Sequence, residues 1–336
     1  MNVFAYRLPG KAEVQAFCSE TAITGLAEGC FVVAPFDGAA EETLSIPAER
    51  RINLEDSAQL IRESLVRDRA LRRHPFPARS VSESEHGMLV QKIVKEIKEG
   101  NLCKCVAARA ERKEGVIDIR ASFEALCQAY PNAFVFLFHT TLSGAWMGAS
   151  PELLGRRRGR GIESMSLAGT REAGSDEAWG VKNLEEHKIV TQYIVDAFDR
   201  NGVEAICEGP VTYAAGPVEH LMTRISGEAN SPETAGRVVR ELSPTPALCG
   251  FPPKSAKRFI RMSESFDRGY YGGYCGPVRA GGDFDLFVNL RSMTIEENSY
   301  CLIAGGGIMA ESEPEKEWAE TVSKASTLLK LLKLQK

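Results

Sequence analysis

The sequence predicts an α+β fold with large, mainly antiparallel β-sheets flanked by helices. Strand-like segments come in runs separated by helices, without the strict strand–helix alternation that is typical of parallel sheets. No repeat period and no low-complexity tract runs through the 336 residues, which disfavours solenoids and propellers. The composition, 43% hydrophobic and 26% charged, is that of an ordinary globular protein and excludes a disordered or collagen-like chain.

Charge and cysteine usage exclude several further classes of protein. The chain has 41 Lys+Arg against 45 Asp+Glu and no long basic run, which argues against a general nucleic-acid binder. Its nine cysteines are scattered without a CxxC pair, so neither a disulfide framework nor a zinc site is indicated. The chain starts without a secretory signal pattern and has no uncharged apolar window of about 18 residues. We therefore expect a reduced, cytoplasmic protein with neither a membrane nor a nucleic acid as partner.

Residues 1–81 are expected to form a short N-terminal lobe and a connection, within the same globule as a second part over 82–336. The run CFVVAPF over 30–36 is strand-like. From about residue 40 to 86 the chain is polar, contains three prolines and has few apolar stretches, which indicates a connection.

The remaining elements follow from hydrophobic periodicity. Apolar residues three and four apart, followed by Gly100 and Asn101, predict a helix over 84–99. Alternating residues predict a strand that begins at Leu102 and runs to Arg109. The same criteria predict strands over 133–139, 144–149, 162–167, 285–292 and 299–304, and helices over 181–199, 231–241, 253–263 and 313–334.

A carboxylate faces inward on the helix predicted over 181–199. Glu186 shares a face with apolar residues at offsets of three, four, seven and eleven: Ile189, Val190, Tyr193 and Ala197. An unpaired buried carboxylate is costly, so an inward Glu186 requires a cation. The alternative is an acid that merely stabilises the positive end of the helix macrodipole.

The helix predicted over 313–334 supplies a second set of acids. The segment 312–315, Ser-Glu-Pro-Glu, predicts a capping box with a proline in the first turn. Downstream, Glu317, Glu320 and Lys324 differ by three and four residues and therefore share one face. A solvated acidic face with a Glu320–Lys324 ion pair is the alternative.

Three glycines and two cations stand out in the predicted strands. Residues 305–307 are all glycine and predict a turn after a strand, whose amide N–H groups face an anion. No GxGxxG or GxxxxGK[ST] pattern indicates a dinucleotide or a nucleoside triphosphate. Arg291 is either an edge feature or a clamp for an oxyanion. Lys104 lies between two cysteines, and an apolar setting lowers a lysine pKa as a general base requires, whereas snorkelling to solvent is the alternative.

These features, in this order, resemble the chorismate-utilising enzymes, which include anthranilate synthase component I, aminodeoxychorismate synthase, salicylate synthase and isochorismate synthase. The resemblance covers about 82–333 and implies the fold of that family. It rests on nine segments: KCVAAR (104–109), ASPELL (149–154), LAGTR (167–171), EH (186–187), HL (220–221), PTPA (244–247), FDRG (266–269), GGG (305–307) and EWAE (317–320).

Within the family, the resemblance favours the isochorismate branch. Lys104 resembles the isochorismate and salicylate branches, since the amine-transferring branches usually have Gln there and pair with a glutamine amidotransferase. The segments 243–252 and 266–273 look like those of isochorismate synthases, except that Ser243 stands where His is common. The resemblance thus implies an isomerase of the menaquinone or siderophore pathway with no obligatory amidotransferase subunit. A salicylate synthase and a catalytically silent chorismate-binding subunit are the alternatives.

The resemblance also implies a role for individual residues. Lys104 would be the base that activates water for attack at C2 of chorismate, and Glu152 the acid that protonates the departing C4 hydroxyl. A Mg²⁺ ion would be held by four acids, Glu186 and Glu320 with Glu317 and Glu185 in support. Substrate contacts would come from Thr170, His220, Ala247, Leu248, Arg291, Gly305, Gly306, Gly307 and Lys324.

Overall fold

The computed structural model of the chain describes residues 1–38, 42–67, 71–215 and 218–335. Within these residues the strands form two nine-stranded sheets, and every neighbouring pair is antiparallel. The predicted α+β class with large antiparallel sheets is therefore confirmed.

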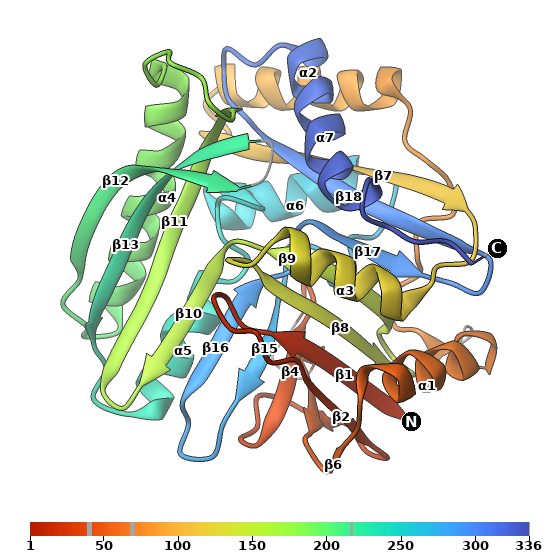
Figure 1. Cartoon of the computed structure of the whole chain (residues 1–336). Helices are drawn as coiled ribbons and strands as arrows, with labels where there is room; N and C mark the ends of the chain where they lie inside the picture. The colour runs from red at the N-terminus through yellow and green to blue at the C-terminus, as the bar shows by residue number, and fades with distance from the viewer. Residues whose placement is uncertain (39–41, 68–70, 216–217, 336) are drawn as a thin grey trace.

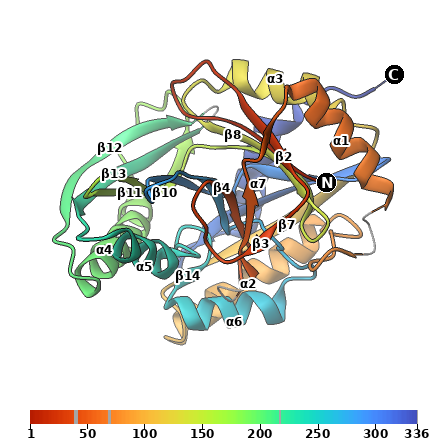
Figure 2. The same cartoon turned by 90° about the horizontal axis from the view of Figure 1, so that it is seen from below.

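Both sheets combine strands from distant parts of the sequence (Figures 1 and 2). The first sheet contains, in spatial order, β14 (Gly250–Phe251), β7 (Lys104–Glu114), β18 (Ser299–Ile308), β17 (Ser292–Ile295), β9 (Gly144–Ser150), β8 (Phe134–Thr140), β1 (Asn2–Arg7), β2 (Gln15–Ser19) and β6 (Arg50–Arg51). The second contains β12 (Ile206–Ala215), β13 (Val218–Glu228), β11 (Gly161–Glu172), β10 (Leu153–Arg158), β16 (Phe284–Val288), β15 (Tyr274–Val278), β4 (Cys30–Ala34), β5 (Leu44–Pro47) and β3 (Ile23–Thr24).

The main core lies where the two sheets face each other, and aromatic side chains join them there. Phe134 of the first sheet stacks on Phe287 of the second, with ring centroids 4.3 Å apart. Phe4 and Phe31 make a second stacked pair across the same interface at 4.8 Å. All four rings are buried, and offset stacking of this kind adds to the gain from burying their area.

Helices cover the remaining faces. Helices α1 (Leu54–Arg67) and α3 (Ile119–Ala129) bury apolar residues against the first sheet. Helices α2 (Glu83–Lys98), α6 (Pro253–Ser263) and α7 (Pro314–Leu329) contact the first sheet at β7, β14 and β18, whereas α4 (Val181–Arg200) and α5 (Pro232–Leu242) contact the second. No helix in the described part of the chain is long and apolar enough to span a membrane.

The helices that periodicity predicted are confirmed, with ends within a few residues for α2, α4, α5 and α6. Helix α7 ends at Leu329, five residues earlier than predicted. The capping box predicted at its start is wrong, because Glu313 is the N-cap and makes no side-chain capping bond. Ser312 instead donates a hydrogen bond to Glu317 across 2.6 Å.

The prediction of one strand over 285–292 is also wrong. Strand β16 ends at Val288, and β17 begins at Ser292 in the other sheet. Arg291 therefore lies in the crossing between the two sheets, with a left-handed φ of 46°. Periodicity cannot reveal such a crossing, because the apolar pattern continues on both sides of it.

The segment predicted as a connection contains elements that the sequence pattern did not reveal. Strands β5 and β6 and helix α1 all lie within residues 40–86, of which 40, 41 and 68–70 are outside the described residues. Two of the buried residues of α1 are Ser57 and Ser64, which weakens its apolar stripe. Strand β1 pairs with β2 and β8, and β4 pairs with β5 and β15, so residues before 48 complete both sheets.

Candidate active site

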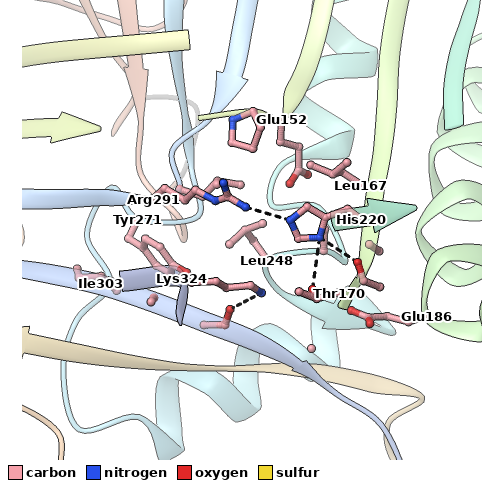
Figure 3. A pocket seen from close by; sticks show the side chains of 18 residues that line it. Glu152, Leu167, Thr170, Glu186, His220, Leu248, Tyr271, Arg291, Ile303 and Lys324 are labelled. Atoms are coloured by element: carbon pink, nitrogen blue, oxygen red, sulfur yellow. Dashed lines mark hydrogen bonds between the residues drawn. The ribbon is translucent and has the colours of Figure 1, made fainter. Parts of the chain in front are cut away.

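A cavity lies between the two sheets and helices α4 and α7. Its lining comes from segments far apart in the sequence: Glu152 follows β9, Thr170 and His220 lie on β11 and β13, and Lys324 lies on α7. Figure 3 shows these side chains around one space, with the Arg291–His220 contact between Glu152 and Glu186. The long-range sheet pairing therefore assembles the cavity.

Ten of the fifteen residues that the sequence suggested line this cavity. They are Glu152, Thr170, Glu186, His220, Ala247, Leu248, Arg291, Gly305, Gly307 and Lys324. Lys104, Gly306, Glu317 and Glu320 lie directly behind this lining, in contact with its residues or with one another. Glu185 is exposed on α4 and does not line the cavity, whereas its neighbour Glu186 is buried and does.

Lys104 and Glu186 form a buried ion pair. The Lys104 side chain on β7 is completely buried, which excludes snorkelling, and its Nζ lies 2.8 Å from Glu186 Oε1. Burial by itself raises the pKa of Glu186, but Lys104, together with Lys324 and Lys182, outweighs this and leaves the pKa below its usual value. Glu186 thus has the cation that its inward position requires.

The glycines of β18 make room for this pair, and they do not form the turn that the sequence suggested. Residues 305–307 continue β18 and pair with β7. A Cβ on Gly307 would lie 2.1 Å from Glu186 Oε1 and 2.8 Å from Lys104 Cε. Only glycine therefore allows both charged side chains to lie against the strand. The Gly305 carbonyl accepts a hydrogen bond from Lys324 Nζ across 3.0 Å, so this backbone faces a cation as well.

A second acidic group lies over Gly306. Glu317 Oε2 and Glu320 Oε1 lie 3.2 and 3.4 Å from the position that a Cβ of Gly306 would take. Lys182 Nζ contacts Glu317 Oε1 at 2.6 Å, and Lys324 Nζ contacts Glu320 at 2.7 Å. Burial first and Glu320 second raise the pKa of Glu317, because both oppose its negative charge.

These acids are suited in chemistry to a hard cation. Among the described residues, no three His, Cys, Asp or Glu side chains are already arranged around one point as ligands. Glu317 Oε2 is nevertheless buried without a hydrogen-bond partner, which is costly for a carboxylate oxygen. Together with Glu186 and Glu320 it offers the oxygen donors that Mg²⁺ prefers.

Glu152 is the acid whose pKa is most clearly perturbed. Its side chain is buried after β9, and burial raises its pKa to about 8 although Lys104 lowers it. Thr245 donates a hydrogen bond to Glu152 Oε1 across 3.4 Å. The carboxyl is therefore largely protonated at neutral pH, as a general acid requires.

Arg291 and His220 form the cationic end of the cavity. His220 Nδ1 lies 2.9 Å from the Gly169 carbonyl, so this nitrogen carries the proton. Nε2 is then the acceptor for the Arg291 guanidinium at 3.0 Å. Burial, followed by the charges of Arg291 and Lys324, lowers the pKa of His220 to about 3, which keeps the ring neutral. Arg291 keeps its charge, since burial lowers its pKa only to about 10.

The apolar wall at Ala247 and Leu248 is held from behind by a buried ion pair. Arg268 donates to the carbonyls of Leu248 and Val106 and pairs with Glu264. The cavity lining also includes residues to which the sequence assigned no role: Pro151, Leu167, Ala168, Gly169, Tyr271, Leu290, Ile303 and Ala304. Most lie one or two positions from an assigned residue. Their closeness to these residues in the sequence is the signal that could have identified them.

The chain is similar to known chorismate-binding enzymes over most of its length. A family model described as chorismate binding enzyme matches residues 12–333. Isochorismate synthase EntC of Escherichia coli (strain K12) is 34% identical over 232 residues, covering 66% of this chain and 59% of EntC. Isochorismate synthase DhbC of Bacillus subtilis (strain 168) is 30% identical over 320 residues, covering 89% of this chain and 79% of that protein.

The crystal structure of DhbC from Bacillus anthracis is similar along nearly the whole chain. The two superpose with a TM-score of 0.80 at 25% identity, covering 98% of this chain and 96% of that one. The region shared with EntC is about three fifths of EntC's own length.

Proposed function

The chain belongs to the family of chorismate binding enzymes, and from this membership we propose that it is an isochorismate synthase. The reaction is an isomerisation in which water attacks C2 of the chorismate ring and the C4 hydroxyl leaves. The observation that carries the proposal is the pair of buried groups Glu152 and Lys104. Glu152 lines the cavity with a pKa that burial raises to about 8, and Lys104 lies directly behind the lining. An exchange of hydroxyl groups needs such a base and acid together.

The two proton transfers balance across the ring. Lys104 is paired with Glu186 as an ammonium and must first release this proton to solvent. Its amine then takes a proton from the attacking water as the C2–O bond forms. Glu152 gives its proton to the C4 oxygen as the C4–O bond breaks, and this oxygen leaves as water. Each such transfer contributes about 10²–10⁴ in rate. The product has the same composition as the substrate, as an isomerisation requires.

Chorismate carries two carboxylates, and the cavity supplies cations for them. Arg291, held by His220, is a planar donor suited to a carboxylate. Lys324 also lines the cavity and pairs with Glu320. We assign one carboxylate to Arg291 and the second to the region of Lys324 and the acidic residues.

The second carboxylate would lie beside Glu186, Glu317 and Glu320, and a divalent cation held by these acids would attract it. We propose Mg²⁺, held by Glu186, Glu317 and Glu320. When bound, the ion would neutralise the acids and attract the substrate carboxylate. The unpartnered Glu317 Oε2 supports this assignment.

Product analysis tests the proposal. The protein is incubated with chorismate and Mg²⁺ without ammonia, and products are separated by chromatography and identified by mass. We expect a new species of unchanged mass with the retention of isochorismate, formed at least about 10²-fold more slowly by Glu152→Gln. Salicylate together with pyruvate would instead identify a salicylate synthase, and unchanged chorismate would indicate a silent binding subunit. The product would feed menaquinone or siderophore biosynthesis.

A further inference from the structure

Lys182 lies beside the proposed metal ligands and has no part in the reaction described above. It lies in the first turn of α4, and its Nζ contacts Glu317 Oε1 at 2.6 Å. Its ammonium therefore pairs with the acid whose other oxygen, Oε2, is buried without a hydrogen-bond partner. It neutralises an acid that the metal would also neutralise.

The acids are already balanced by lysines. Lys104 pairs with Glu186, Lys182 with Glu317 and Lys324 with Glu320, which gives three cations for three carboxylates. Adding Mg²⁺ to this arrangement would leave two excess positive charges in a partly buried space. Like charges at short range in a low-dielectric site repel strongly, so binding of the metal favours departure of one ammonium.

Of the three lysines, Lys182 is the one that can leave. Its side chain is 32% exposed, against 0% for Lys104 and 18% for Lys324. Lys324 is also held by the Gly305 carbonyl. Lys182 lies near the start of a helix, from which a long side chain can turn to solvent.

We propose that Lys182 is an exchangeable counter-ion of the magnesium site. Its ammonium neutralises Glu317 when no metal is bound, and it turns to solvent when Mg²⁺ takes its place. The inference rests on the proposed metal of the proposed function and extends it to a residue that controls the affinity for that metal.

Lys182→Met removes the charge and keeps the length of the side chain. Calorimetric titration with Mg²⁺ should show at least about tenfold tighter binding than in the wild type, because no ammonium competes. Without metal the variant should unfold at a lower temperature, since Glu317 is left buried and unpaired, and Mg²⁺ should restore the lost stability. Two control variants should bind Mg²⁺ as the wild type does. Lys182→Arg keeps the charge, and Lys188→Met changes an exposed position on the same helix.

Mg²⁺ binding by Lys182→Met that is unchanged or weaker than in the wild type overturns the counter-ion role and leaves the proposed reaction intact. If the methionine variant does not fold, Lys182→Gln should show the same gain in affinity, and its failure to do so also overturns the role. A wild type that binds no Mg²⁺ overturns both the role and the proposed metal, and product analysis then decides separately on the isomerisation.

Discussion

At the scale of single residues, two buried glutamates of the site, Glu186 and Glu152, have opposite protonation states. Lys104 and Glu186 neutralise each other at 2.8 Å, so their charges are retained inside the protein. Glu152 is buried without an ion pair to any described residue, and its carboxyl accepts one long hydrogen bond from Thr245. Burial without close pairing favours its neutral form. The different environments of two glutamates, Glu152 and Glu186, therefore separate a proton donor from a charged acid.

The pH dependence of turnover should report Glu152. Its raised pKa of about 8 means that the carboxyl is protonated below this pH and ionised above it. We expect kcat to fall as the pH rises through about 8, because the ionised form cannot donate a proton. Glu152→Gln should lose at least about 10²-fold in kcat, with unchanged circular dichroism. A glutamine variant with normal turnover would contradict the assignment.

His220 should act on substrate affinity through Arg291. Its Nε2 accepts from Arg291, and its Nδ1 is anchored on Gly169. A hydrogen bond to a charged group contributes about 1.5–3 kcal/mol, so His220→Ala should raise KM for chorismate by about tenfold or more. Steady-state kinetics at several substrate concentrations measures this effect, and an unchanged KM would show that Arg291 keeps its position without the histidine.

At the scale of elements, β18 and its three glycines decide how close the charged side chains come. The strand pairs with β7, which carries Lys104, and its glycines lie against Glu186 of α4 and Glu317 of α7. Side chains at 306 and 307 would occupy the space of these acids. The glycines therefore allow the charged side chains of the site to approach the strand. A run of glycines in the sequence does not by itself distinguish such a strand from a turn.

Gly307→Ala tests this role directly. The new methyl group would lie 2.1 Å from Glu186 Oε1, so the Lys104–Glu186 pair must move apart. We expect turnover to fall by at least about 10²-fold, as for loss of a positioned proton-transfer group, while the protein remains folded. The matched control is Gly161→Ala on β11, whose nearest neighbour would be at 3.4 Å. Equal activities of the two variants would exclude the steric role.

At the scale of the whole molecule, the N-terminal residues and the catalytic residues belong to the same two sheets. Strand β1 lies between β2 and β8, and β4 lies between β5 and β15. Phe4 and Phe31 also belong to the core between the sheets. Removal of these strands would expose the edges of β8 and β15 together with apolar core, a combination that promotes aggregation.

A chain of residues 82–336 should therefore fail to fold independently. We expect it to be aggregated or to lack a cooperative thermal transition, whereas the full chain should unfold with its N-terminal strands in one main transition by calorimetry. A soluble 82–336 fragment with its own sharp transition would show that the first 81 residues form a separable lobe.

The sequence by itself determined five of the helices and indicated the residue types of the site. Periodicity predicted α4 and α7 and placed Glu186 on the inward face of α4, because a helix repeats its faces every three to four residues. The family motifs indicated Lys104 and Glu152, and both are buried beside one cavity. These properties are local, so a single segment is enough to reveal them.

Only the tertiary structure decided which charges meet. Lys104 and Glu186 are 82 positions apart, and Lys182 and Glu317 are 135 apart, and neither pairing follows from the pattern of its own segment. Neighbours from other strands and helices also decide three local features. These are the crossing at Arg291, the continuation of β18 through residues 305–307 and the exposure of Glu185. Periodicity tells which face of an element is buried, but the partner of that face is set by long-range sheet pairing.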